Sequence, residues 1–189
     1  MLVGLDIDAD ALSLARERLP GAELIQADLL TWTPLDRLQH GAGLVIAGGD
    51  LLPLFTEATD LERLFSQAAA LLSPGGAFGI DATLIDTGLL SEAASDSAWS
   101  EDVRWASEEV GEVRRESRLL PDPTGRAGHA QLQVRHWHAG DATPDQRDPF
   151  AIRAWQPAEL ERIADGVGLR LHQRASADRL RWLLRSRHV

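Results

Sequence analysis

Residues 1–81 alternate between short apolar runs and segments of helical periodicity, and this alternation constrains the fold more than any other feature. The apolar runs lie at 2–5, 22–25, 44–47 and 77–80. Between the first two, Leu12, Ala15 and Leu19 recur at the spacing of one helix face. Strands that alternate with helices build mostly parallel sheets covered by helices. The sequence therefore predicts an α/β fold.

Turn-forming residues mark the ends of these elements. Asp8 or Asp10 can cap the first helix, and Pro20-Gly21 ends it. A second helix is expected over 60–72. Ser73-Pro74-Gly75-Gly76 follows it, and we interpret this segment as a turn that re-enters the sheet.

Beyond residue 81 the helical periodicity fades, and two runs with period-two character predict an antiparallel hairpin. The runs cover 110–120 and 130–138, and Pro121-Asp122-Pro123-Thr124-Gly125 between them has the composition of a turn. We interpret residues 82–150 as an insertion over the sheet that covers the substrate. Residues 151–189 are expected to close the sheet, with a helix from Gln156-Pro157 to Gly168 and two last strands. Together, residues 1–189 are expected to form a single domain.

Composition argues against several classes of partner. The net charge of −10 and the pI near 5.0 oppose nucleic-acid binding. The C-terminal arginines are interpreted as solvating a terminal strand; they are Arg179, Arg181, Arg185 and Arg187. No cysteine is present, so disulfides and thiolate chemistry are absent. Without an apolar run of about 20 residues or a signal-peptide pattern, we expect no membrane partner and a cytoplasmic location.

Acidic and glycine residues follow three of the expected strands, where ligands bind in open α/β sheets. Asp6 follows the first strand and can accept hydrogen bonds from both hydroxyls of a ribose, although it could also cap a helix. Asp28 follows the second strand and is either an acceptor for an adenine amine or a plain turn residue. Gly48-Gly49-Asp50 follows the third strand, either as a ligand-approach site or as a tight turn.

The ordered set of these motifs resembles the class I S-adenosylmethionine-dependent methyltransferases of the Rossmann-like, small-molecule type. The resemblance is carried by 3–8, 26–28, 44–49 and 71–76, and more loosely by 153–160 with 164–168. It implies a mostly parallel sheet with an antiparallel last strand, and S-adenosylmethionine as cofactor. Residue by residue, it implies that Asp6 binds the ribose hydroxyls, that Ile7 packs on adenine and that Asp28 contacts the adenine amine. Leu29 would offer its backbone amide to the ring, and Gly48 would line the methionine end.

Two departures from the family pattern accompany the resemblance. Many relatives carry an aspartate near the start of the third strand, where this chain has Gly43. The family's glycine-rich turn stands about 20 residues before the ribose acid, whereas five residues precede Asp6. We therefore expect an N-terminally incomplete sheet that lacks a central strand, with unpaired backbone groups on its neighbours.

No universal catalytic residue identifies methyl transfer, so candidates for a base come from residue type alone. They are His129, His136 and His138, since histidine titrates near neutrality. His136 and His138 share one strand face, but no third metal ligand is evident, so no metal site is expected. Four tryptophans could wall a substrate pocket or pack in the core: Trp99, Trp105, Trp137 and Trp155. Arg153 could hold a substrate carboxylate or pair with a surface acid.

The sequence thus predicts methyl transfer from S-adenosylmethionine to an N or O atom of a small molecule. One alternative is a non-catalytic remnant or interaction protein that keeps the scaffold. Another is a nicotinamide-dependent oxidoreductase, which also places an acid after its second strand; the position of Asp28 and of Pro74-Gly75-Gly76 favours the methyltransferase order.

Overall fold

The structure, a computed structural model, describes residues 1–83, 85–107, 111–174 and 179–186. Four α-helices lie in the described part of the chain: α1 (Ala9–Arg18), α2 (Ala58–Leu71), α3 (Thr87–Asp96) and α4 (Pro157–Gly166). The strands are β1 (Val3–Asp6), β2 (Glu23–Gln26), β3 (Ala42–Ala47), β4 (Leu72–Thr83), β5 (Ser100–Ser107), β6 (Gly111–Pro121), β7 (His129–His138), β8 (Asp145–Gln146), β9 (Phe150–Arg153), β10 (Leu169–Arg174) and β11 (Arg179–Ser186). None of the helices described is long and apolar enough to cross a membrane.

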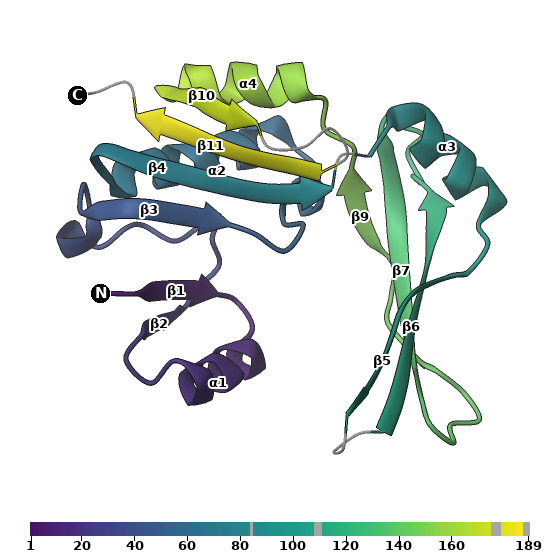
Figure 1. Ribbon diagram of the computed structural model, residues 1–189. Coiled ribbons are helices and arrows are strands. Elements are labelled where there is room, and N and C mark those ends of the chain that lie inside the picture. Colours follow the sequence, from purple (N-terminus) through teal and green to yellow (C-terminus); the bar gives the residue numbers. More distant parts are fainter. Residues whose placement is uncertain (84, 108–110, 175–178, 187–189) are drawn as a thin grey trace.

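The alternating strands form two sheets that lie side by side in Figure 1. β1 and β2 are parallel, with Val3 opposite Glu23 and Asp6 opposite Gln26. The second sheet has the order β10-β11-β4-β3, in which β3 and β4 are parallel and β11 is antiparallel to both of its neighbours. The predicted α/β class, with parallel leading strands and an antiparallel last strand, is confirmed.

The facing edges of β1 and β3 have no strand partner among the described residues, because β1 pairs with β2 and β3 pairs with β4. Two apolar side chains of β3, Leu44 and Ile46, alternate with the core-facing Val45 and Ala47, and they are 56% and 69% exposed. The sequence interpretation expected a central strand to be missing from the sheet, and this expectation stays a prediction.

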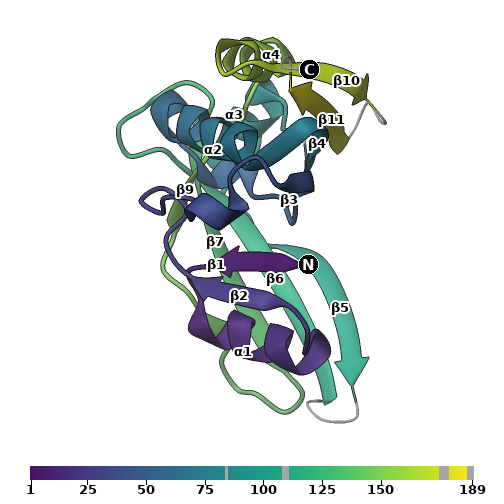
Figure 2. The same cartoon turned by 90° about the vertical axis from the view of Figure 1, so that its left-hand side faces the viewer.

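The main core lies between the β10-β11-β4-β3 sheet and the helices α2 and α4, which pack on one of its faces (Figure 2). Helix α2 contributes Leu61, Phe65 and Ala68 at the spacing of one helix face, and α4 contributes Leu160 and Ile163. The rings of Phe65 and Phe78 meet edge to face at 5.5 Å. Burial of this apolar stripe holds the helices on the sheet.

The turn predicted at residues 73–76 lies inside strand β4, so that prediction is corrected. Helix α2 ends at Leu71, and Leu72 already pairs with Ala42 of β3. The register then shifts, because the next pair joins Leu44 to Ala77. Gly75 has a φ of +74°, and a side chain at Gly76 would meet the carbonyl oxygen of Ala42 at 2.8 Å. The two glycines therefore form an irregularity within the strand.

The predicted hairpin corresponds to β6 and β7, which pair antiparallel from Val113–His138 to Pro121–Ala130. It belongs to a larger antiparallel sheet with β5, β8 and β9, which the sequence interpretation did not predict. Helix α3, also missed, covers one face of this sheet. Its Leu90 and Ala94 pack with Ala130 and Ile152 in a second core. In Figure 1 this sheet stands across the carboxyl ends of β1, β3 and β4, with α3 on its far side.

Candidate functional site

The carboxyl ends of β1 and β2 bring Asp6 and Asp28 to the same edge of the first sheet. Asp6 ends β1 opposite Gln26, and the Ala27 amide donates to the Asp6 carbonyl at 3.0 Å. Asp28 is the next residue along the chain. The two predicted adenosine-binding acids therefore lie at neighbouring strand ends, as the parallel register requires.

Each acid uses one carboxylate oxygen to close its own turn. Asp6 Oδ1 accepts from the Asp8 amide at 2.9 Å, and Asp28 Oδ1 accepts from the Leu30 amide at 2.8 Å. In both, the other oxygen accepts no hydrogen bond from another described residue. Helix capping is done by a different residue, Asp8, which accepts from the amides of Asp10 and Ala11. Asp6 is therefore not needed as the cap that the alternative interpretation proposed.

The residue that follows each acid exposes a different group: Ile7 exposes its side chain, and Leu29 leaves its backbone amide without an acceptor among the described residues. Ile7 is 66% exposed, so a large apolar side chain lies uncovered beside Asp6. The Leu29 side chain packs against the main core. Its backbone amide donates to no acceptor in the described part of the chain. The arrangement thus offers an apolar surface, a free N–H donor and two carboxylate oxygens at one edge of the sheet.

The third strand end forms a tight, exposed turn. Gly48 is exposed, and Gly49 and Asp50 adopt positive φ angles of +73° and +59°. The Asp50 carboxylate accepts from the Thr83 amide at 2.5 Å and thereby ties the ends of β3 and β4 together. A side chain at Gly48 would meet nothing nearer than 3.8 Å. Gly48 therefore leaves space at this edge, while Asp50 has a structural contact.

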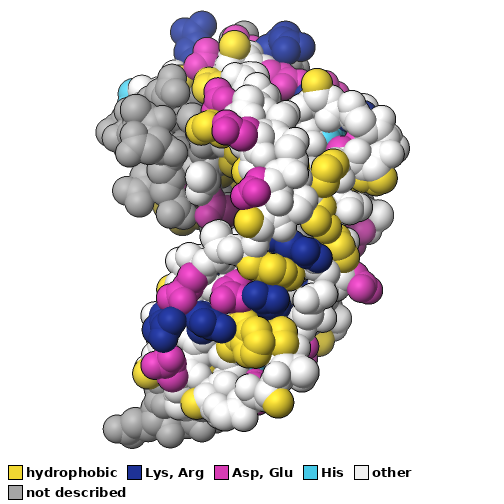
Figure 3. Space-filling view, turned by 90° about the vertical axis from the view of Figure 1, so that its right-hand side faces the viewer, with side chains coloured by type: hydrophobic (Ala, Val, Ile, Leu, Met, Phe, Trp, Pro, Cys, Tyr) yellow, Lys and Arg dark blue, Asp and Glu magenta, His cyan; other side chains and the backbone are white. Residues whose placement is uncertain are grey.

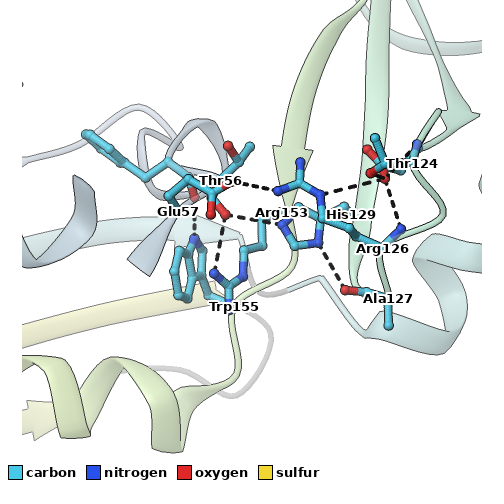
Figure 4. Close-up of polar contacts among 10 residues, drawn as sticks. Thr56, Glu57, Thr124, Arg126, Ala127, His129, Arg153 and Trp155 are labelled. Atoms are coloured by element: carbon cyan, nitrogen blue, oxygen red, sulfur yellow. Dashed lines mark hydrogen bonds and ion pairs between the residues drawn. The ribbon is translucent and has the colours of Figure 1, made fainter. Parts of the chain in front are cut away.

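The five-stranded antiparallel sheet formed by β5 to β9, which we call the β5–β7 sheet, uses one of its two faces to contact the loop that follows β3 (Figure 4). His129 Nε2 lies 3.2 Å from the Thr56 carbonyl oxygen, and Arg153 donates to the same oxygen at 3.3 Å. Arg126 pairs with Glu57 at 2.6 Å. Because side chains alternate along a strand, the odd-numbered residues of β7 share the His129 face. That face is turned toward the strand ends.

The three histidine candidates do not all lie on the same face of this sheet. His129 lies in the docking contact, between the carbonyl oxygens of Ala127 and Thr56. His136 and His138 point to the opposite face, the one that α3 covers farther along. Burial and the nearby Arg115 and Arg147 lower the pKa of His136. Neither His136 nor His138 is directed at the strand ends, and no three metal-ligating groups converge among the residues described.

Two further candidates have structural contacts. Trp155 is buried in the main core, where its indole nitrogen donates to the carbonyls of Leu52 and Phe55. Arg153 pairs with Glu159 at 2.6 Å, which is the acid-pairing alternative.

Trp105 lies on the α3 side of the sheet, edge to face with His136 at a centroid distance of 6.4 Å. Of the C-terminal arginines, Arg187 and the side chains of Arg179 and Arg181 lie outside the described part.

Sequence interpretation missed a polar face of the β5–β7 sheet that is turned toward the strand ends. Its arginines, Arg114, Arg118 and Arg135, alternate with residues of the other face along β6 and β7. The period-two pattern that predicted the hairpin already contained this signal. Which face is turned toward the strand ends follows only from the docking contacts.

Fold and strand-end site together define a class: the chain has the fold of the class I S-adenosylmethionine-dependent methyltransferases. An S-adenosylmethionine-dependent methyltransferase from Clostridium acetobutylicum superposes with a TM-score of 0.71 at 12% identity. The superposition covers 97% of this chain and 74% of that one. An amino pentose methyltransferase from Micromonospora echinaspora, solved with S-adenosylmethionine bound, gives 0.67 at 18% identity, over 96% and 72%. The resemblance stated from the motifs is confirmed at the level of the fold.

Sequence similarity leads to one group of enzymes. The chain is 31% identical over 161 residues to a trans-aconitate 2-methyltransferase of Rhizobium leguminosarum, which is 80% of this chain and 56% of that protein. It is 37% identical over 84 residues to the enzyme of the same name from Paracidovorax citrulli, covering 28% of it. The chain thus spans about half, or less, of the curated relatives it matches. No protein-family model matches it.

Proposed function

We propose that this chain binds the adenosine part of S-adenosylmethionine and serves methyl transfer to an N or O atom of a small molecule. The observation that carries the proposal is the position of Asp6 and Asp28 at adjacent strand ends. In each of them, one carboxylate oxygen accepts no hydrogen bond from another described residue. The Leu29 amide and the exposed Ile7 side chain complete a set that suits a ribose and an adenine ring. Gly48 leaves room for the methionine end of the cofactor.

In the proposed reaction, bound S-adenosylmethionine supplies an electrophilic methyl group for an in-line displacement. The chain's own residues bind and orient: Asp6 holds the ribose, and Asp28 with Leu29 fixes the base. The β5–β7 sheet, which spans part of residues 82–150, excludes water and presents the acceptor from its His129 face. Residues 1–189 would act as one unit, because the Thr56 and Glu57 contacts hold that sheet against the strand ends.

The relatives support a small-molecule acceptor, since their name gives trans-aconitate as what they methylate. A net charge of −10 also opposes a nucleic-acid acceptor.

Isothermal titration calorimetry of residues 1–189 with S-adenosylhomocysteine tests the proposal. Asp6→Asn keeps the acceptor for the Asp8 amide but removes the charge that the ribose hydroxyls would meet. We expect binding about tenfold or more weaker, the usual cost of a lost charge-assisted hydrogen bond. Asp28→Asn should also weaken binding. Asp10→Asn, an equal charge change on exposed α1, is the matched control and should leave affinity unchanged.

The alternative of a non-catalytic scaffold is favoured by one observation, the unpaired facing edges of β1 and β3. It makes the opposite prediction for the same titration. A folded chain, shown by circular dichroism, that binds no S-adenosylhomocysteine would overturn the cofactor proposal and favour the scaffold. Equal binding by the wild type and by Asp6→Asn would refute the assigned role of Asp6.

A further inference from the structure

One face of the β5–β7 sheet carries a cluster that we call the arginine–tryptophan face. It consists of Trp99, Arg114, Glu116, Arg118, Gln133, Arg135 and Trp137. Three of its cross-strand pairs follow directly from the register: Arg114 with Trp137, Glu116 with Arg135, and Arg118 with Gln133. It shares its face with His129, so it is turned toward the strand ends.

Most of the cations on this face are already neutralised. Arg135 donates to Glu116 at 2.5 Å, and Arg114 lies 3.3 Å from the same carboxylate. The Trp137 indole also donates to Glu116 at 2.9 Å. On the neighbouring strand, Arg104 pairs with two acids, Glu101 and Glu112.

Arg118 differs because its partner is a neutral amide. Its Nε and Nη2 donate to Gln133 Oε1 at 2.9 and 2.8 Å, and no carboxylate of the described residues pairs with it. Gln133 is only 5% exposed, and its Nε2 donates to the Arg147 carbonyl at 3.2 Å. That second bond fixes the amide with its oxygen toward Arg118. The guanidinium is therefore held in place, and no carboxylate of the described residues neutralises its positive charge.

An aromatic surface adjoins this guanidinium. The Arg118 guanidinium carbon lies 4.7 Å from the centroid of the half-buried Trp99 ring, and that of Arg135 lies 4.0 Å from the same ring. The Nη1 group of Arg118 donates to no acceptor in the described part of the chain. A rigid cation with outward N–H donors next to an indole is suited to a flat anion with an apolar body.

We propose that Arg118 on Trp99 is the anchoring site for a carboxylate of the methyl acceptor, which makes the acceptor a small organic acid. A single negative charge fits better than a phosphate dianion, because Glu116 lies on the same face and repels added charge. The inference rests on the proposed function for the identity of the ligand as acceptor.

The test uses benzoate as the probe, with benzamide as its uncharged counterpart and inorganic phosphate as a second anion. Calorimetry gives the affinities, and the ¹⁵N–¹H signal of the Arg118 Nε–H group reports the site. We expect benzoate to shift that signal and to bind about tenfold or more tightly than benzamide. Arg118→Gln should weaken benzoate binding by about tenfold or more, and Arg118→Lys by less. Arg63→Gln, a surface change on α2, should have no effect.

Equal affinity of Arg118→Gln and wild type for benzoate would overturn the site, as would tighter binding of phosphate than of benzoate. If Arg118→Gln does not fold, the benzoate–benzamide comparison and Arg118→Lys still decide. S-adenosylhomocysteine binding is measured separately on the same samples. Cofactor binding without benzoate binding rejects the acid site alone, and the reverse result rejects the cofactor proposal alone.

Discussion

The guanidinium carbon of Arg153 lies 3.6 Å from the centroid of the Trp155 ring, at the junction between the antiparallel sheet and the main core. Trp155 is 4% exposed and donates to the carbonyls of Leu52 and Phe55. Arg153 belongs to β9 and contacts Thr56 and Glu159. The pair thus links the end of β9, the loop after β3 and the start of α4.

Trp155→Ala is expected to lower the free energy of unfolding by about 3–5 kcal/mol, because it removes a large buried ring. Trp155→Phe should cost less, since it keeps most of the ring volume but leaves the two carbonyls without their donor. Urea denaturation measures both. Trp105→Phe, at a position that is 41% exposed, is the control and should change stability little. A loss as large for Trp105→Phe as for Trp155→Ala would contradict the assigned packing.

The pH dependence of folding should include a contribution from His136. Burial, together with the cations Arg115 and Arg147, lowers its pKa in the folded chain below the ordinary value of 6.5, although Asp145 acts in the other direction. The fold therefore favours the neutral ring. This contribution to stability is present above the ordinary pKa and is lost as the pH falls through the lowered one.

A ring-proton NMR titration should place the midpoint of His136 below 6.5. In His136→Gln, the fall in stability between about pH 7 and pH 5 should be smaller than in the wild type. A midpoint above the ordinary value would show that Asp145 outweighs burial and the two arginines.

The open edge of β3 should make the isolated chain prone to association. Ile46 is 69% exposed beside unpaired backbone groups, and exposed apolar strand edges template aggregation. We expect Ile46→Thr, which retains strand propensity, to lower the binding of an apolar fluorescent dye and the rate of light-scattering growth. Leu14→Gln, at a helical site that is 56% exposed, is the comparison and should change both less. Equal effects would argue against a special role for the edge.

The local elements of residues 1–81 could be predicted because periodicity and turn chemistry are properties of neighbouring residues. The segments around Asp6, Asp28 and Gly48 were all expected at strand ends, and the structure places them there. Their roles toward a cofactor stay predictions. Helix α3 was missed although Asp86 caps it, accepting from the amides of Gly88 and Leu89. Its small residues give a weak helical period, and its place is set by packing on Ala130 and Ile152.

The sequence by itself determined the alternation of strands and helices and the period-two faces of β6 and β7, because side-chain direction follows from backbone geometry. Only the tertiary structure decided which face is turned toward the strand ends. Contacts of His129 and Arg153 with Thr56 set that choice, and they join residues more than 70 positions apart. The register of β6 and β7 placed Arg118 opposite the Gln133 amide, with no carboxylate of the described residues paired to it. The docking contacts depend on how distant segments fold against each other, which no local pattern encodes.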